Sequence, residues 1–87
     1  MRAYYTNILK HFFNEQLIHT RMEHQLTQAQ MAGLLAMEER SYIDLDHGKT
    51  GCSGLTLVRF LIYCCDNPSI FLEELRVAFE QGTGHAA

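Results

Sequence analysis

Hydrophobic residues along this chain follow the spacing of α-helices. No alternation of apolar and polar residues lasts for the length of a strand, and the chain contains one proline. Between residues 6 and 23, apolar side chains recur every three or four positions, as one buried helix face requires. Together with the turn residues, this pattern predicts an all-α domain with helices over about 6–23, 28–35, 39–47, 56–64 and 68–80.

The first and last of these helices divide into buried and exposed faces. In the first helix, the expected inward positions are Ile8, Phe12, Leu17 or Ile18, and Met22. The expected solvent-facing positions of the same helix are Asn14, Glu15, His19 and Glu23. In the last helix, the expected inward positions are Ile70 or Phe71, Leu75, and Phe79 or Ala78. These faces predict one hydrophobic core and a single domain over residues 1–87.

Several helix ends are marked by residues with known capping roles. Thr27 and Gln30 have the spacing of a capping box at the start of the second helix. Gly48 stands where a glycine ends a helix, after the third one. Asn67 is a suitable N-cap, with Pro68 at the first position of the last helix.

The composition predicts a globular, cytoplasmic protein. Hydrophobic residues make up 47% of the chain, no apolar run approaches the about 20 residues of a membrane span, and the first residues lack the features of a secretory signal. Cys52, Cys64 and Cys65 are odd in number and show no CxxC spacing, so we expect reduced thiols. We expect the tail, residues 81–87, to be disordered.

Charge is distributed unevenly along the chain. The net charge is −3 with the histidines neutral. Residues 1–60 hold equal numbers of acidic and basic residues, and residues 61–87 carry the whole acidic surplus. A neutral region is not a basic patch, and this lowers the expectation of nucleic-acid binding.

The stretch LTQAQMAGLLAMEERSYIDLDHGK, residues 26–49, has what two short helices crossing near a right angle would need. A small residue at the crossing, Ala32, lets the two backbones approach each other. The other apolar residues expected between the helices are Met31, Leu35, Met37, Tyr42 and Leu45. The expected outward positions of the second helix are Glu39, Arg40, Ile43, Asp44 and His47. We expect the Tyr42 hydroxyl to reach water.

On these residues the chain resembles the helix-turn-helix of the Cro/C1-type (XRE) family of bacterial and phage repressors. The matching residues are Leu26-Thr27-Gln28, Ala32 and Leu45-Asp46-His47-Gly48-Lys49. The segment SGLTLVRFLIYC is similar to the family's fourth helix, so the resemblance covers about residues 17–79. It implies a five-helix lambda-repressor-like domain, with its helix-turn-helix at about 27–47, that binds double-stranded DNA as a homodimer and regulates transcription without a cofactor.

The resemblance also implies roles for individual residues. The positions that would contact phosphates or the DNA backbone are Thr27, Gln28 and Lys49. Gln28 has a further implied role at a base edge. The positions that would read bases are Glu39, Arg40 and Asp44, with Ser41 as a neighbouring polar contact.

The chain departs from the family pattern in its turn and in its charge. Ala36 stands where the family usually has glycine at positive φ, at a cost of about 1 kcal/mol. Glu38 occupies the start of the third helix, where serine is usual, and presents a negative charge to phosphate. Residues 38–49 carry four acids and two bases, a net −2. We therefore expect weak, salt-sensitive DNA binding by each protomer, and a dependence on dimerisation.

The sequence leaves two questions open. The net −2 of residues 38–49 also fits a protein-interaction module that kept the fold and lost DNA binding, such as an antirepressor or accessory subunit. The apolar side of the last helix, formed by Phe71 or Ile70 with Leu75 and Phe79, fits either a dimer seam or burial within the monomer.

Metal binding and catalysis are not expected from the sequence. The five histidines lack the convergent spacing of a zinc motif, since His19 and His24 are five residues apart. No glycine-rich phosphate loop or nucleophile elbow is present, and nothing marks Cys64 as an activated thiol.

Overall fold

The computed structural model describes residues 1–82, which form helices joined by short connections and contain no strand. The helices are α1 (Arg2–Glu23), α2 (Gln28–Leu34), α3 (Glu39–Asp46), α4 (Gly54–Tyr63) and α5 (Pro68–Gln81). The all-α class and the order of the predicted helices are confirmed. α1 begins four residues earlier than predicted, and α5 includes Gln81, which was assigned to the tail. Gly82 caps the end of α5, and the rest of that expected tail, residues 83–87, lies outside the described residues.

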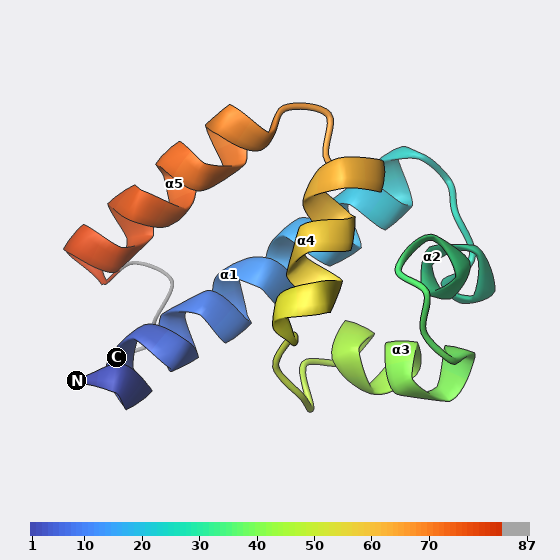
Figure 1. Ribbon diagram of the computed structural model, residues 1–87, viewed down its shortest axis with the longest axis horizontal. Coiled ribbons are helices and arrows are strands. Elements are labelled where there is room, and N and C mark those ends of the chain that lie inside the picture. Colours follow the sequence, from blue (N-terminus) through green and yellow to red (C-terminus); the bar gives the residue numbers. More distant parts are fainter. Residues whose placement is uncertain (83–87) are drawn as a thin grey trace.

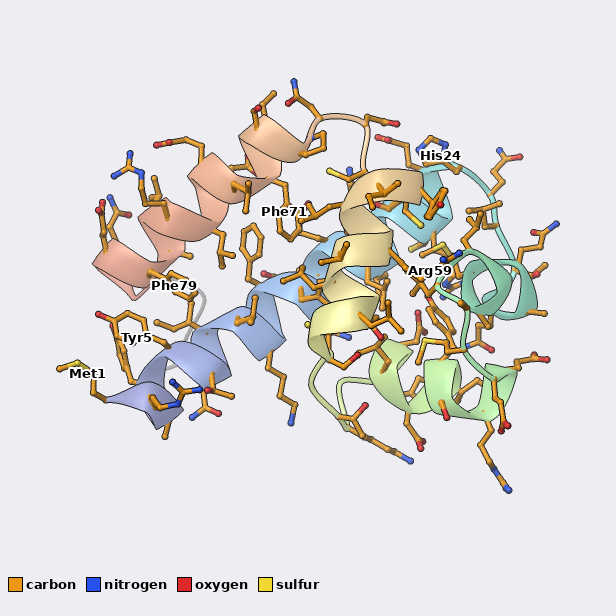
Figure 2. The ribbon with its side chains drawn as sticks, in the orientation of Figure 1. Met1, Tyr5, His24, Arg59, Phe71 and Phe79 are labelled. Carbon is orange, nitrogen blue, oxygen red and sulfur yellow. The ribbon has the colours of Figure 1, made fainter. Side chains whose placement is uncertain are left out.

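The long helix α1 organises the arrangement of the others (Figure 1). α5 packs along it, α4 crosses it, and α2 and α3 lie together beyond α4. α1 and α5 run antiparallel, because the Tyr5 ring meets the Phe79 ring at 5.2 Å and the Phe12 ring meets the Phe71 ring at 5.2 Å. Figure 2 shows Tyr5 and Phe79 facing each other across these two helices.

The N-termini of α2, α4 and α5 are held by side-chain caps. The capping box at α2 is confirmed, because the Thr27 hydroxyl accepts from the Gln30 backbone N–H at 3.1 Å and the Gln30 side chain accepts in return at 2.8 Å. Asn67 caps α5 as predicted. Ser53 caps α4 by accepting from the Thr56 N–H at 3.2 Å, so α4 begins two residues before the predicted start.

Four helices end beside a residue at positive φ. Gln25, Ala36, Gly48 and Gly82 have φ of 55°, 56°, 74° and 69°. After α2, the Met37 N–H donates to the Ala32 carbonyl and the Ala36 N–H donates to the Gly33 carbonyl, which is the Schellman pattern. The prediction that Gly48 ends a helix is confirmed, and Ala36 does adopt the backbone conformation that glycine would adopt more easily.

The core joins α1, α4 and α5 through phenylalanine rings. Phe13 meets Phe60 at 5.2 Å between ring centroids, and Phe60 meets Phe71 at 5.7 Å. The inward side of α5 is buried against α1, so burial within the monomer, and not a dimer seam, is the outcome for Phe71 and Leu75.

Two predictions for α1 are wrong. Met22 was expected inside and is 67% exposed, whereas Phe13, which was not among the expected core residues, is buried. The buried face follows Ile8, Phe12, Phe13 and Leu17, and Met22, five residues after Leu17, is turned about 140° away from Leu17 around the helix axis. No helix in the described part of the chain is both long enough and apolar enough to span a membrane.

Candidate nucleic-acid interface

α2 and α3 pack against each other over a small apolar contact. In Figure 1, α2 is seen nearly end-on while α3 runs across the view, so the two helices cross. The residues buried in this region are Met31, Ala32, Leu35, Tyr42 and Leu45, and Met37 is half-buried against them. Arg59 ties α4 to this pair, because its Nε donates to the Leu34 carbonyl at 3.1 Å. α3 is therefore held on one side only, and its other side faces outward.

The Asp46 carboxylate is the polar centre behind α3. It is 6% exposed and accepts hydrogen bonds from the Tyr42 hydroxyl at 2.9 Å, Arg21 Nε at 3.2 Å and Gln28 Nε2 at 3.4 Å. Arg21 Nη2 also reaches its second oxygen at 3.4 Å, so the ion pair is bidentate. The carboxylate thus joins α1, α2 and α3, and its buried charge has a partner.

Tyr42 has a different environment from the one expected. Its side chain is fully buried, and its hydroxyl donates to Asp46, so the expectation that the hydroxyl reaches water is wrong. Burial, followed by the hydrogen bond and the negative charge of Asp46, raises the pKa of Tyr42 above its ordinary value. The spacing of Tyr42 and Asp46, one helical turn apart, was visible in the sequence, but the arrival of Arg21 from another helix was not.

Asn14 fixes the C-terminus of α3. It was expected to face solvent, but its amide donates to the Leu45 carbonyl at 3.1 Å and to the Asp46 carbonyl at 2.9 Å. The last carbonyls of a helix lack partners within the helix, so a donor from α1 satisfies them. This contact sets where α3 ends relative to α1.

The outward face of α3 carries most of the residues that the resemblance assigns to base reading. Glu39, Arg40 and Ser41 are exposed, and Asp44 is half-buried on the same helix. Lys49 is exposed just beyond the helix end. These side chains are free to meet a ligand from solvent.

The two positions assigned to α2 are less available. The Thr27 hydroxyl is used in the capping box, and the Gln28 amide lies half-buried against the Asp46 carboxylate. Both side chains already have protein partners. The structure therefore brings the α3 positions and Lys49 to one surface, and uses Thr27 and Gln28 at least in part for the fold.

The buried ion pair changes the charge that this surface presents. The expected net −2 of residues 38–49 counts Asp46, which Arg21 neutralises away from solvent. With Asp46 set aside, Glu38, Glu39 and Asp44 face Arg40 and Lys49, a net −1. The surface is nearly neutral, with Arg40 and Lys49 as its cations.

The thiols show no sign of activation. Burial raises the pKa of Cys64 and of Cys52, which favours the protonated, unreactive form. Both cysteines are therefore structural in character.

Comparisons with protein-family models, with curated proteins and with solved structures found no match in any of the three.

Proposed function

We propose that this chain is a sequence-specific DNA-binding transcriptional regulator of bacterial or phage type, with a lambda-repressor-like fold in which α2 and α3 are the helix-turn-helix. The observation that supports the proposal is the division of α3 into two faces. Tyr42 and Leu45 are buried on one side, and Glu39, Arg40 and Ser41 are exposed on the other. A helix held in this way can enter a major groove without losing its own packing.

Arg40 and Glu39 are the residues that would distinguish bases. An arginine can donate two hydrogen bonds to guanine, and a carboxylate can accept from the cytosine amine, each worth about 1–3 kcal/mol of discrimination. Lys49 would pair with a phosphate, and Ser41 and Asp44 would flank the contact. Because so few phosphates are neutralised, most of the free energy of specific binding must come from base edges.

A second copy of the chain would supply the affinity that one protomer lacks. We place the dimer contact on α4, where Leu55, Val58 and Ile62 are 67%, 50% and 63% exposed at helical spacing. A two-fold axis brings identical faces together, so the face must not carry unpaired charge. The one charged residue of α4, Arg59, is turned to the Leu34 carbonyl and lies 4.7 Å from the centre of the Tyr63 ring.

The proposal is tested by selecting bound fragments from genomic DNA at low and at moderate salt. We expect enrichment of defined fragments at low salt, lost with Arg40→Ala. Lys49→Ala should weaken binding to all fragments and lower the salt slope by about 1. Arg76→Ala is the matched control, because it removes the same charge from an exposed position on α5. If no fragment is enriched even at low salt, the proposal fails.

A protein-interaction module is the second candidate, and the nearly neutral outward face of α3 favours it. In that case the same face would bind a protein in place of phosphates. Arg40→Glu separates the two candidates, because a carboxylate cannot donate to guanine and is repelled by the DNA phosphates. A defined protein complex that survives Arg40→Glu, in a chain that enriches no DNA fragment, would support the second candidate.

A further inference from the structure

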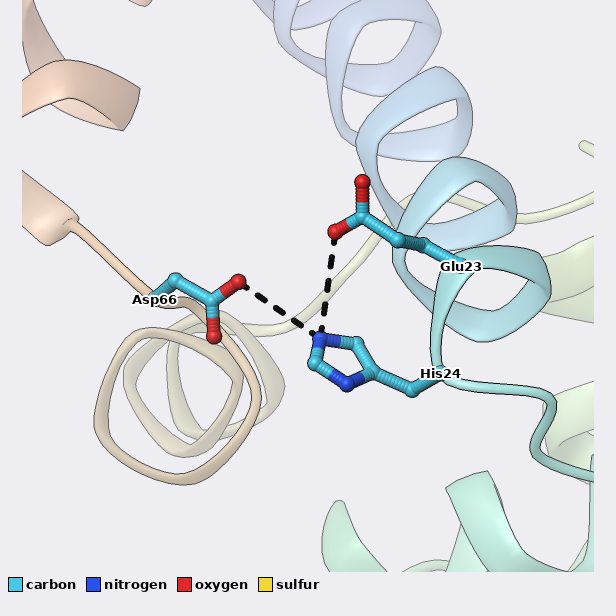
Figure 3. A group of neighbouring side chains, drawn as sticks. All are labelled: Glu23, His24 and Asp66. Carbon is cyan, nitrogen blue, oxygen red and sulfur yellow. Dashed lines mark ion pairs between the residues drawn. The ribbon is translucent and has the colours of Figure 1, made fainter.

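Three side chains with metal-binding atoms meet where the end of α1 approaches the connection between α4 and α5 (Figure 3). Glu23 is the last residue of α1, His24 follows it, and Asp66 lies in the α4–α5 connection. His24 Nε2 is 3.6 Å from Asp66 Oδ2 and 4.0 Å from Glu23 Oε1. The three ligand atoms all lie within 4.8 Å of one another, and all three residues are exposed.

What sets this cluster apart from the other histidine–carboxylate pairs is the third ligand atom, and the distances leave room for a shared ion. A charge-assisted hydrogen bond from an imidazole to a carboxylate has a length of about 2.7–2.9 Å. Two ligand atoms on a tetrahedral zinc ion, each about 2.0–2.1 Å from the metal, are about 3.3 Å apart. The 3.6 Å separation of His24 Nε2 from Asp66 is close to such an edge, and the 4.0 Å separation from Glu23 is longer, so the exposed Glu23 side chain must move closer to share the ion.

We propose that Glu23, His24 and Asp66 form a Zn²⁺ site, with water as the fourth ligand. One imidazole nitrogen with two carboxylate oxygens is a donor set that zinc accepts, whereas Mg²⁺ and Ca²⁺ prefer oxygen ligands alone. The two carboxylates balance the charge of the ion. A surface hollow of about 320 Å³ lined by His24, Cys65 and Asp66 opens beside the cluster and leaves room for the water.

A zinc ion here would join segments that are far apart in the chain. It would tie the end of α1, from which α2 and α3 follow, to the connection that leads into α5. Binding to the folded chain alone stabilises it in proportion to the logarithm of zinc concentration. The inference concerns this cluster and is independent of DNA binding.

The sequence did not reveal this cluster. In the sequence His24 stands five residues after His19, and neither pairs with another histidine at metal-binding spacing. Asp66 comes from a distant segment, and only the fold brings it to His24. His19 lies on the other side of Glu23, with its Nε2 3.4 Å from Glu23 Oε2, and is the natural competitor for the ion.

Zinc titration of the full metal-free chain, followed by calorimetry and thermal unfolding, tests the site. We expect one Zn²⁺ per chain, and a rise in Tm of roughly 10–20 °C when zinc is at about one hundred times its Kd. Co²⁺ in place of Zn²⁺ should give the intense visible absorption of a tetrahedral site. His24→Gln and Asp66→Asn should each weaken zinc binding by at least about tenfold.

The matched control is His11→Gln. His11 pairs with Glu15 on the same helix, with Nε2 3.6 Å from Oε1, but no third ligand approaches that pair among the described residues. The His11→Gln variant should bind zinc with the affinity of the unchanged chain. Unchanged affinity in Asp66→Asn would overturn the proposal, because zinc would then sit on the His19–Glu23 pair. Equal losses in His11→Gln and His24→Gln, or no binding at all, would also overturn it.

Discussion

At the scale of single residues, Asp46 is the acidic residue of α3 that is buried and paired with Arg21, so its charge is not presented to solvent. Its carboxylate is buried and holds three side chains from three helices. We expect Asp46→Asn to lower the free energy of unfolding by about 2–3 kcal/mol, because Arg21 loses its ionic partner in a mostly buried position. Urea unfolding at neutral pH measures the change.

Asp44→Asn is the control for Asp46. It makes the same chemical change on the same helix, where the carboxylate is half-buried and bonds no side chain among the described residues. We expect a change below about 0.5 kcal/mol. Equal effects of the two substitutions would show that the hydrogen bonds to Asp46 contribute little.

The buried Tyr42 predicts a loss of stability at alkaline pH. Its pKa in the folded state lies above its ordinary value of 10.0, so the folded chain keeps a proton that the unfolded chain releases. Stability from this group is complete below pH 10 and falls above it, by about 1.4 kcal/mol per pH unit. Tyr42→Phe should flatten this part of the pH profile, measured by urea unfolding between pH 8 and 11. A profile identical to that of the unchanged chain would contradict this account.

Residue environments were only partly predictable from the sequence. The burial of Tyr42 followed from its place three residues before Leu45 on an apolar helix face. Its bond to Asp46 required knowing that Arg21 neutralises the carboxylate, and Arg21 comes from a helix distant in sequence. Asn14 was assigned to solvent for the same reason, since a polar residue on α1 gives no sign of the carbonyls that it meets.

At the scale of elements, the turn between α2 and α3 contains a strained position. Ala36 has φ of 56° and an exposed side chain, so its methyl group gains no packing there. We expect Ala36→Gly to stabilise the chain by about 0.5–1 kcal/mol, because relief of the left-handed strain exceeds the added entropy of the unfolded chain. Thermal unfolding should show a Tm higher by a few degrees.

Ala29→Gly is the control, because the same replacement of alanine by glycine is expected to lower the stability there. Ala29 is exposed near the start of α2 and has helical backbone. Glycine there should destabilise by up to about 1 kcal/mol. If glycine raised the stability at both positions, the effect of Ala36→Gly would not come from the backbone conformation of residue 36.

Element types were predictable because helix periodicity and capping are local. The cap at Thr27 and the stop at Gly48 could be placed from a few neighbouring residues. The start of α4 was missed, because Ser53 lies in a glycine-rich stretch that resembles a loop throughout. Met22 was placed inside by the spacing of apolar residues, but the buried face of α1 runs through Phe13 and Leu17, and Met22 lies off that face.

At the scale of the whole molecule, the exposed face of α4 tests the proposed dimer. Val58→Glu places a charge in the middle of the stripe that Leu55 and Ile62 continue. We expect the chain to sediment as a monomer and to lose at least about tenfold in DNA affinity, since two copies would no longer be linked. Its Tm should change little, because Val58 is half exposed. A dimer that survives Val58→Glu would place the contact elsewhere.

The residues of the candidate surface were easier to predict from the sequence than the charge that the surface presents to solvent. Formal charge gave −2 for residues 38–49, and only the fold shows that Asp46 lies behind α3, paired with Arg21. The sequence left open whether the apolar side of α5 is a dimer seam or is buried within the monomer, and the fold shows that it is buried against α1. Both outcomes depend on contacts between distant segments.

The long first helix has a consequence for how the chain tolerates change. α1 has 22 residues and a length of about 33 Å, which equals the longest dimension of the fold. Its early turns hold α5, while Asn14 and Arg21 further along orient α3. Deleting one residue between Leu17 and Arg21 would rotate Arg21 by about 100° around the helix axis. Such a shortened chain would keep the ring contacts between the early turns of α1 and α5, while Arg21 would no longer point at the Asp46 carboxylate behind α3.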